Sequence, residues 1–122
     1  MLPDDILRFI SQTIGSIWAL EVLLLIRADR SRAWTVEVLS RELRSTAGIV
    51  ANVLARFRGA GIVDAGPDGR YWYRPASARI EAIVEELAVI YAKYPIAVTE
   101  AIYASPDHKI RLFADAFRLR KE

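Results

Sequence analysis

The stretch TVEVLSRELRSTAGIVANVLARFRGAGIVDAGPDGRYWYRP, residues 35–75, decides the fold. Apolar residues at helical spacing predict a first helix over residues 36–44, with Thr35 as its N-cap. Ser45-Thr46 makes a turn and caps a second helix, Ala47–Gly59. One face of that helix is apolar and we expect it to be buried, since its residues recur at i, i+3, i+4 and i+7: Val50, Val53, Leu54 and Phe57.

A hairpin is expected directly after this helix pair. Residues 62–65 and 70–73 read as two short strands, and Pro67-Asp68-Gly69 between them is a strong turn signal, because proline fixes φ and Asp-Gly tolerates positive φ. Pro75 ends the second strand. Residues 33–35 read as a further short strand that pairs with the hairpin.

The flanking segments are predicted to be helical. An N-terminal helix is expected over residues 4–28. Its later half is apolar on almost every side, which favours a subunit interface. Ser77 opens a long helix that Pro95 kinks or breaks, since proline cannot donate the helical hydrogen bond. Ser105-Pro106-Asp107 signals a last helix with an apolar stripe that includes Phe113 and Phe117.

Composition places the chain among globular proteins and excludes several kinds of chemistry. It has 122 residues, 53% of them hydrophobic and 26% charged, so we expect one folded domain spanning residues 1–122. The absence of cysteine excludes disulfides, thiolate catalysis and cysteine-bound metals, and suits the cytoplasm. His108 is the single histidine, and no nucleophile–base arrangement is visible. We therefore expect no enzyme, metal site or cofactor.

Membrane insertion is not expected, and positive charge gathers in two places. The longest apolar run, residues 14–26, is too short to cross a bilayer and contains Glu21. The net charge is +2, but residues 41–74 hold six arginines against three acidic residues. The C-terminal segment is also basic. This distribution suits a nucleic-acid contact in the middle of the chain, although a net +3 is also common on ordinary surfaces.

The central stretch resembles the helix-turn-helix of winged-helix bacterial transcriptional regulators. The resemblance covers roughly residues 14–94 and rests on three segments: Leu39-Ser40-Arg41-Glu42-Leu43, Val50 through Leu54 to Phe57, and Gly61-Ile62-Val63. Phe57 stands where leucine is usual. The chain looks most similar to the multiple-antibiotic-resistance regulators and the iron–sulfur-sensing repressors, but it lacks the cysteines that hold the cluster of the latter.

The resemblance implies a mostly α-helical winged helix-turn-helix with a small β-hairpin wing and long N- and C-terminal helices. Within it, residues 1–34 form the dimerisation helix and a loop, residues 35–75 the helix-turn-helix and wing, and residues 76–122 the C-terminal helices. A cytoplasmic dimeric repressor is then expected, in which the N-terminal helix over residues 4–28 and the last helix of the chain hold two copies together. The dimer would read a palindromic site in double-stranded DNA.

Candidate DNA contacts lie on the side of the second helix opposite its apolar face. Asn52 is suited to adenine, and Arg56 to guanine or phosphate. Arg70, beside the turn of the hairpin, is placed for the minor groove or a phosphate. The full set of candidates comprises Arg41, Arg44, Ser45, Thr46, Gly48, Ala51, Asn52, Arg56 and Arg70.

Two other readings stay open. The outer side of the second helix is rich in alanine and glycine and only modestly basic, which also suits a protein-interaction module without DNA binding. A regulator that senses a small-molecule effector between the wing and the long helices fits the same pattern.

Overall fold

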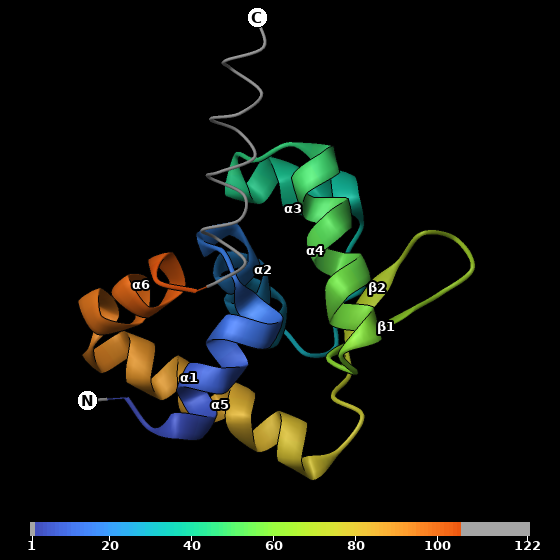
Figure 1. Cartoon of the computed structure of the whole chain (residues 1–122). Helices are drawn as coiled ribbons and strands as arrows, with labels where there is room; N and C mark the ends of the chain where they lie inside the picture. Colours follow the sequence, from blue (N-terminus) through green and yellow to red (C-terminus); the bar gives the residue numbers. More distant parts are fainter. Residues whose placement is uncertain (1, 106–122) are drawn as a thin grey trace, which may run out of the picture.

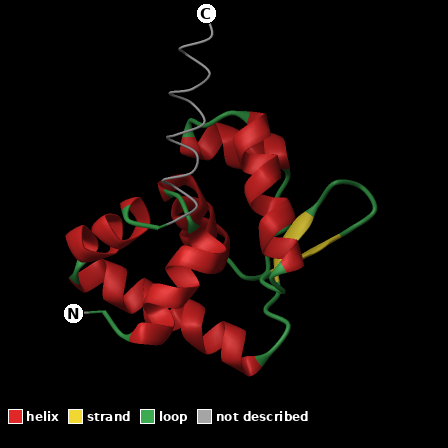
Figure 2. Ribbon diagram, in the orientation of Figure 1, coloured by secondary structure: helices red, strands yellow, loops and turns green. Residues whose placement is uncertain are grey.

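The protein is mostly helical and carries one small antiparallel sheet (Figures 1 and 2). The computed structural model describes residues 2–105, so the helix expected after Ser105 and His108 lie outside the described residues. The elements are α1 (Asp4–Phe9), the π-helical turn η1 (Ile10–Ile14), α2 (Ile17–Ala28), α3 (Val36–Leu43), α4 (Ala47–Gly59), β1 (Val63–Ala65), β2 (Tyr71–Tyr73), α5 (Ala78–Lys93) and α6 (Pro95–Tyr103). The prediction of a mostly helical fold with a small β-hairpin is thus confirmed.

The prediction of one helix over residues 4–28 is wrong, because the chain turns sharply at Gly15. Gly15 has a φ of 70°, which glycine adopts at little cost, and its N–H donates to the carbonyl oxygen of Ile10 at 2.8 Å. Ser16 then caps α2, since its Oγ accepts from the N–H of Ala19 at 3.1 Å. The two helical segments meet at an angle of 102°.

The central helix pair begins at the predicted caps. Thr35 Oγ1 accepts from the N–H of Val38 at 3.2 Å, and Thr46 Oγ1 accepts from the N–H of Ile49 at 3.3 Å. The bounds of α4 agree with the prediction. Between the helices, Arg44 ends α3 in the left-handed conformation, with a φ of 55°. This sharp reversal lets α3 and α4 pack against each other.

The hairpin is present, and it gains a third partner. Val63 pairs with Tyr73 and Ala65 with Tyr71 in an antiparallel register. Trp34 forms a single bridge to Tyr71: its N–H donates to the Tyr71 carbonyl at 2.8 Å and its carbonyl accepts from the Tyr71 N–H at 2.7 Å. The expected pairing of residues 33–35 with the hairpin is thus confirmed at Trp34.

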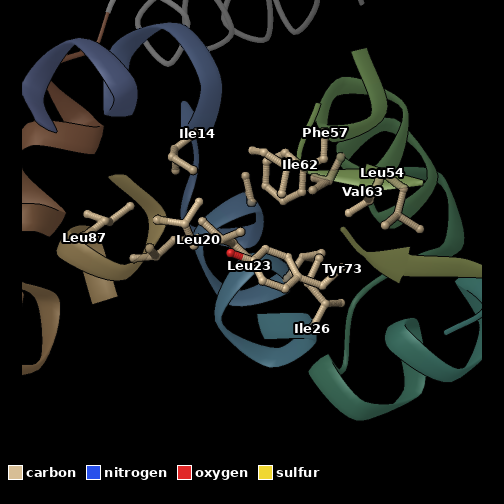
Figure 3. Packing of buried hydrophobic residues seen from close by; sticks show 14 of the residues in the cluster. Ile14, Leu20, Leu23, Ile26, Leu54, Phe57, Ile62, Val63, Tyr73 and Leu87 are labelled. Atoms are coloured by element: carbon tan, nitrogen blue, oxygen red, sulfur yellow. The ribbon is translucent and has the colours of Figure 1, made fainter. Parts of the chain in front are cut away.

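Helix α2 runs through the middle of the molecule. Figure 3 shows Leu20 and Leu23 of α2 between Leu87 of α5 on one side and Phe57 of α4 on the other. All four side chains are fully buried. The buried apolar side chains of α2 therefore find their partners within one chain, whereas Ile17, Trp18, Leu24 and Leu25 are only partly buried.

Ion pairs tie the end of α2 to α5. Arg27 forms two hydrogen bonds to the carboxylate of Glu85, at 2.5 and 2.7 Å, and Arg30 pairs with Glu81. The Arg27 guanidinium holds the pKa of Glu85 below its ordinary value. The α5–α6 pair is joined to the rest of the molecule by these ion pairs, by Leu87 against α2, and by the packing of α1 and η1 against it.

Within residues 2–105, no single helix has the length and hydrophobicity needed to cross a membrane. The N-terminal segments before and after Gly15 reach that combination only when taken together. They are bent at Gly15, and many of their apolar side chains lie in the core.

Candidate nucleic-acid interface

Helix α4 turns one side to the core and the opposite side to solvent. Val50, Leu54 and Phe57 are fully buried. The opposite side is exposed along its whole length, and its residues recur at intervals of three and four: Gly48, Ala51, Asn52, Ala55, Arg58 and Gly59. The structure thus places Gly48, Ala51 and Asn52 together on one accessible surface, which we call the outer face of α4.

The side chains of the outer face are mostly small, so they project little from the helix backbone. A Cβ atom added at Gly48 would meet no atom within 4 Å, so the packing of the chain itself does not demand glycine there. Gly48 is the second residue of α4, two positions after its N-cap Thr46. Such a residue lets another molecule approach the backbone closely, as the edges of bases do in a groove.

Two exposed arginines precede α4, Arg41 in the last turn of α3 and Arg44 in the turn between the helices. Thr46 is exposed as well. Ser45 is different: its hydroxyl oxygen is buried without a hydrogen-bond partner in the described structure. The Ser45 hydroxyl is therefore buried, and only its backbone could meet a ligand at the start of α4.

Arg56 does not lie on the outer face. Its side chain is half-buried, and Nη1 donates to the backbone carbonyl oxygen of Ile14 at 3.2 Å. Ile14 is the last residue of η1, where a helix leaves carbonyl oxygens without partners. The sequence-based assignment of Arg56 to a base or phosphate therefore does not fit this geometry, because the guanidinium binds the bend before α2.

Arg58 was missed in the sequence analysis and takes the place expected of Arg56. It is exposed at the end of the outer face, seven residues after Ala51, a spacing that returns to the same side of a helix. Arg58 and the exposed Arg74 border an open hollow of about 500 Å³ at the base of the hairpin. Asp64 also lines this hollow. Arg74 and Asp64 form a loose ion pair at 3.4 Å.

The hairpin presents Arg70 to solvent. Its Nε lies 3.1 Å from a carboxylate oxygen of Asp68, and both side chains are more than half exposed. The loop between the strands is closed by a hydrogen bond from the Gly66 N–H to the Arg70 carbonyl at 2.8 Å. Trp72 packs against Gly66, where a Cβ atom would lie only 2.9 Å from the indole. This contact fixes the path of the loop and hence the position of Arg70.

The side of the hairpin that faces the core is packed instead of open. Tyr73 is buried, with its hydroxyl lacking a hydrogen-bond partner among the described residues, and burial raises its pKa. The Arg30 guanidinium lies 5.2 Å from the centre of its ring. No group of three or more His, Asp or Glu side chains suited to a metal ion occurs in the part of the chain that the structure describes.

Comparisons with known proteins give no relative from which a function could be transferred. No protein-family model matches the chain, and searches of curated proteins and of solved structures found no significant match. The geometry of the outer face and of its flanking arginines is therefore the available evidence on function.

Proposed function

We propose that the protein is a DNA-binding transcriptional regulator of the winged helix-turn-helix kind, with the outer face of α4 in the major groove and the hairpin as the wing. The order of elements supports it: α2, the Trp34 bridge, α3, the turn, α4 and the hairpin follow one another as in that fold. Repression by occupying a palindromic site in the cytoplasm, by two copies of the chain, is the form we favour.

One observation carries the proposal. The most accessible side of α4 is made of small residues with Asn52 among them, and exposed arginines flank it on α3, at the end of α4 and on the hairpin. Small residues permit close approach to bases, an asparagine side chain matches the edge of adenine, and arginines on either side suit the two phosphate backbones of a groove. Arg41, Arg44, Arg58 and Arg70 are the proposed phosphate contacts.

A protein-interaction module is the second candidate, and the outer side of α4 also provides its support. Ile49 is 37% exposed beside the outer face, on the same side of α4 as Arg56, and no basic residue lies between Arg44 and Arg56. Both basic residues of α4, Arg56 and Arg58, lie in its last turn, so the positive charge of the helix is at its C-terminal end. A face of this kind also suits a partner with an apolar surface.

The experiment is a titration of random-sequence duplex DNA with the full chain at several salt concentrations. Arg58→Ala and Arg70→Ala should each weaken binding and reduce the slope of log affinity against log salt by about one. Arg8→Ala is the matched control, because Arg8 is exposed on α1, away from α4 (Figure 1).

The control variant should bind as the wild type does. If the wild type binds no duplex, or if all three arginine variants change affinity equally, the DNA-facing assignment is wrong. The second candidate would then become the better account of the outer face.

A further inference from the structure

A separate hollow of about 140 Å³ lies between the N-terminal helical segment and α5. Helices α1 and α5 pack side by side there (Figure 1). None of the lining residues belongs to α3, α4 or the hairpin, because all of them come from α1, η1 and α5. We call this site the α1–α5 hollow. It is distinct from the outer face of α4 and from the hollow at the base of the hairpin.

Five polar side chains from three elements surround the α1–α5 hollow. Helix α1 supplies Asp5 and Arg8, η1 supplies Gln12 and Thr13, and α5 supplies Arg79. Asp5, Arg8 and Gln12 are three and four residues apart, so they lie on one side of the N-terminal segment. Arg79 approaches the same space from the neighbouring helix.

The three charged side chains have no charged partner in the described part of the chain. Within residues 2–105, none of Asp5, Arg8 and Arg79 takes part in an ion pair. Asp5 uses one carboxylate oxygen, Oδ1, to accept from the N–H of Ile6 at 2.8 Å. The hollow therefore carries two guanidinium groups and one carboxylate whose charges residues 2–105 do not neutralise.

The two side chains from η1 are available for hydrogen bonds. In residues 2–105, neither Gln12 nor Thr13 makes a side-chain hydrogen bond. Ser40 and Thr99, in contrast, return their hydroxyls to the carbonyl oxygen four residues earlier, at 2.7 and 2.8 Å. A π-helical turn is rare and occurs frequently at functional sites. Here it is the element that gives the hollow its two neutral hydrogen-bonding groups.

The charges and the size of the hollow indicate a class of ligand. Two guanidinium groups suit a carboxylate, and the carboxylate of Asp5 suits an ammonium group. Phe9 and Ile83 complete the lining and offer apolar contact. A cavity of this volume holds a molecule about as large as benzene. A small α-amino acid combines these features, since it has one carboxylate, one ammonium group and a short side chain.

A ligand with one kind of charge fits the hollow less well. Inorganic phosphate would meet both arginines, but it would also place negative charge beside Asp5, and like charges repel. An amine without a carboxylate would leave both guanidinium groups unpaired.

We infer that the α1–α5 hollow binds a small zwitterionic amino acid, with Arg8 and Arg79 at its carboxylate and Asp5 at its ammonium group. Phe9 and Ile83 contact its side chain. The inference goes beyond the proposed DNA binding and does not depend on it, since the hollow shares no residue with the proposed DNA contacts.

The test is a titration of the full chain with L-valine, followed by two-dimensional proton–nitrogen NMR without DNA. Isovalerate and isobutylamine are the matched ligands, because they are valine without its ammonium group and valine without its carboxylate. Backbone signals of residues 5–13 and 79–83 should shift with L-valine. Its dissociation constant should be about 1 mM or lower, and about tenfold below those of the two analogues.

The role of Asp5 is tested by removing its charge alone. Asp5→Asn keeps an oxygen that accepts from the Ile6 N–H. It should lower the affinity for L-valine about tenfold and should not lower the affinity for isovalerate. Asp4→Asn is the matched control, because Asp4 is also in the first turn of α1 but does not line the hollow. The control should bind both ligands as the wild type does.

The two arginines are tested in the same way. Arg8→Gln and Arg79→Gln should each weaken the binding of L-valine and of isovalerate about tenfold. Lys93→Gln removes one positive charge from the last turn of α5, outside the hollow, and should leave both affinities unchanged. The same spectra report whether each variant is folded, which separates a lost contact from a lost structure.

Several results would overturn the inference. A wild type whose spectrum L-valine does not change would do so, as would isovalerate or inorganic phosphate that binds at least as tightly as L-valine. Arginine variants that bind like Lys93→Gln, or an Asp5→Asn variant that still prefers L-valine to isovalerate, would also contradict it.

These outcomes are separate from those of the DNA titration. A chain that binds duplex DNA but not L-valine would contradict the amino-acid site alone. A chain that binds L-valine in the predicted pattern but no duplex would contradict the proposed function alone.

Discussion

Arg56 of α4 donates from Nη1 to the carbonyl oxygen of Ile14, 42 residues earlier in the chain, at 3.2 Å. The acceptor is the last residue of the π-helical turn, next to Gly15, where the chain bends by 102°. The proposed reading helix is therefore attached by a side chain to the bend between α1 and α2. Arg56 thus helps to hold α4 in place, and the residues of the outer face form the accessible surface of the helix.

Replacing Arg56 should weaken the fold more than replacing its exposed neighbour. Arg56→Met keeps the aliphatic part of the side chain but leaves the Ile14 carbonyl without its donor, so the free energy of unfolding should fall by about 1–2 kcal/mol. Arg58→Met is the control and should change it by less than about 0.5 kcal/mol. Urea unfolding measures both, and equal losses would remove the role assigned to Arg56.

Replacing Arg44, the left-handed residue between α3 and α4, with glycine should raise the stability of the fold and lower its affinity for DNA. Arg44→Gly relieves a φ of 55° that costs an L-residue about 1 kcal/mol, so the unfolding free energy should rise by about that amount. Arg44→Ala keeps the strain and should give no such gain. Both variants lose the proposed phosphate contact and should bind duplex DNA more weakly than the wild type. If Arg44→Gly binds as tightly as the wild type, Arg44 does not contact DNA.

The carboxylate beside Arg70 should limit the affinity for DNA. Asp68 lies 3.1 Å from Arg70 and places a negative charge where a phosphate is proposed to bind. Asp68→Asn should therefore tighten binding roughly two- to fivefold at low salt, and the gain should shrink as salt is added. Asp4→Asn makes the same change in net charge on α1 and should have no comparable effect. Unchanged affinity for Asp68→Asn would argue against a DNA contact by the hairpin.

The Arg27–Glu85 pair should make part of the stability depend on pH. Because Arg27 lowers the pKa of Glu85 in the folded state, the pair stabilises the fold above the ordinary carboxyl pKa of about 4.3, and this stabilisation is lost as the pH falls through the lowered value. Both side chains are partly exposed, so its size should be about 0.2–1 kcal/mol.

Thermal unfolding between neutral and acidic pH measures this contribution. Glu85→Gln should lower the melting temperature at neutral pH and should narrow its difference from the wild type in acid. Glu42→Gln, exposed on α3, should follow the wild type throughout. A constant difference between wild type and Glu85→Gln at every pH would show that the pair is not the cause.

Local signals in the sequence were enough to predict the central elements. The bounds of α4 follow from its cap at Thr46, from the spacing of its core residues and from Gly61 just after its end. The bend at Gly15 was missed because the apolar pattern continues through it. A glycine followed by a serine that can cap a helix was the available signal, and Ser16 does cap α2.

The candidate site was predictable in outline only. Periodicity assigns Gly48, Ala51 and Asn52 to the outer side of α4, since that depends on the helix alone. The direction of the Arg56 side chain depends on Ile14, and no local pattern reports a partner so distant in sequence. Arg58 could have been found by extending the outer stripe from Ala51 by seven residues.

Selection of bound sequences from random duplex DNA, at low and at near-physiological salt, tests the central claim most directly. If the outer face of α4 reads bases, one sequence should be enriched at both salt concentrations, and it should be palindromic if two copies bind together. Ala51→Gln, which enlarges the outer face without changing its charge, should alter or abolish that enrichment. Binding without any enriched sequence, or enrichment that Ala51→Gln leaves unchanged, would contradict the assignment of α4 as the reading helix.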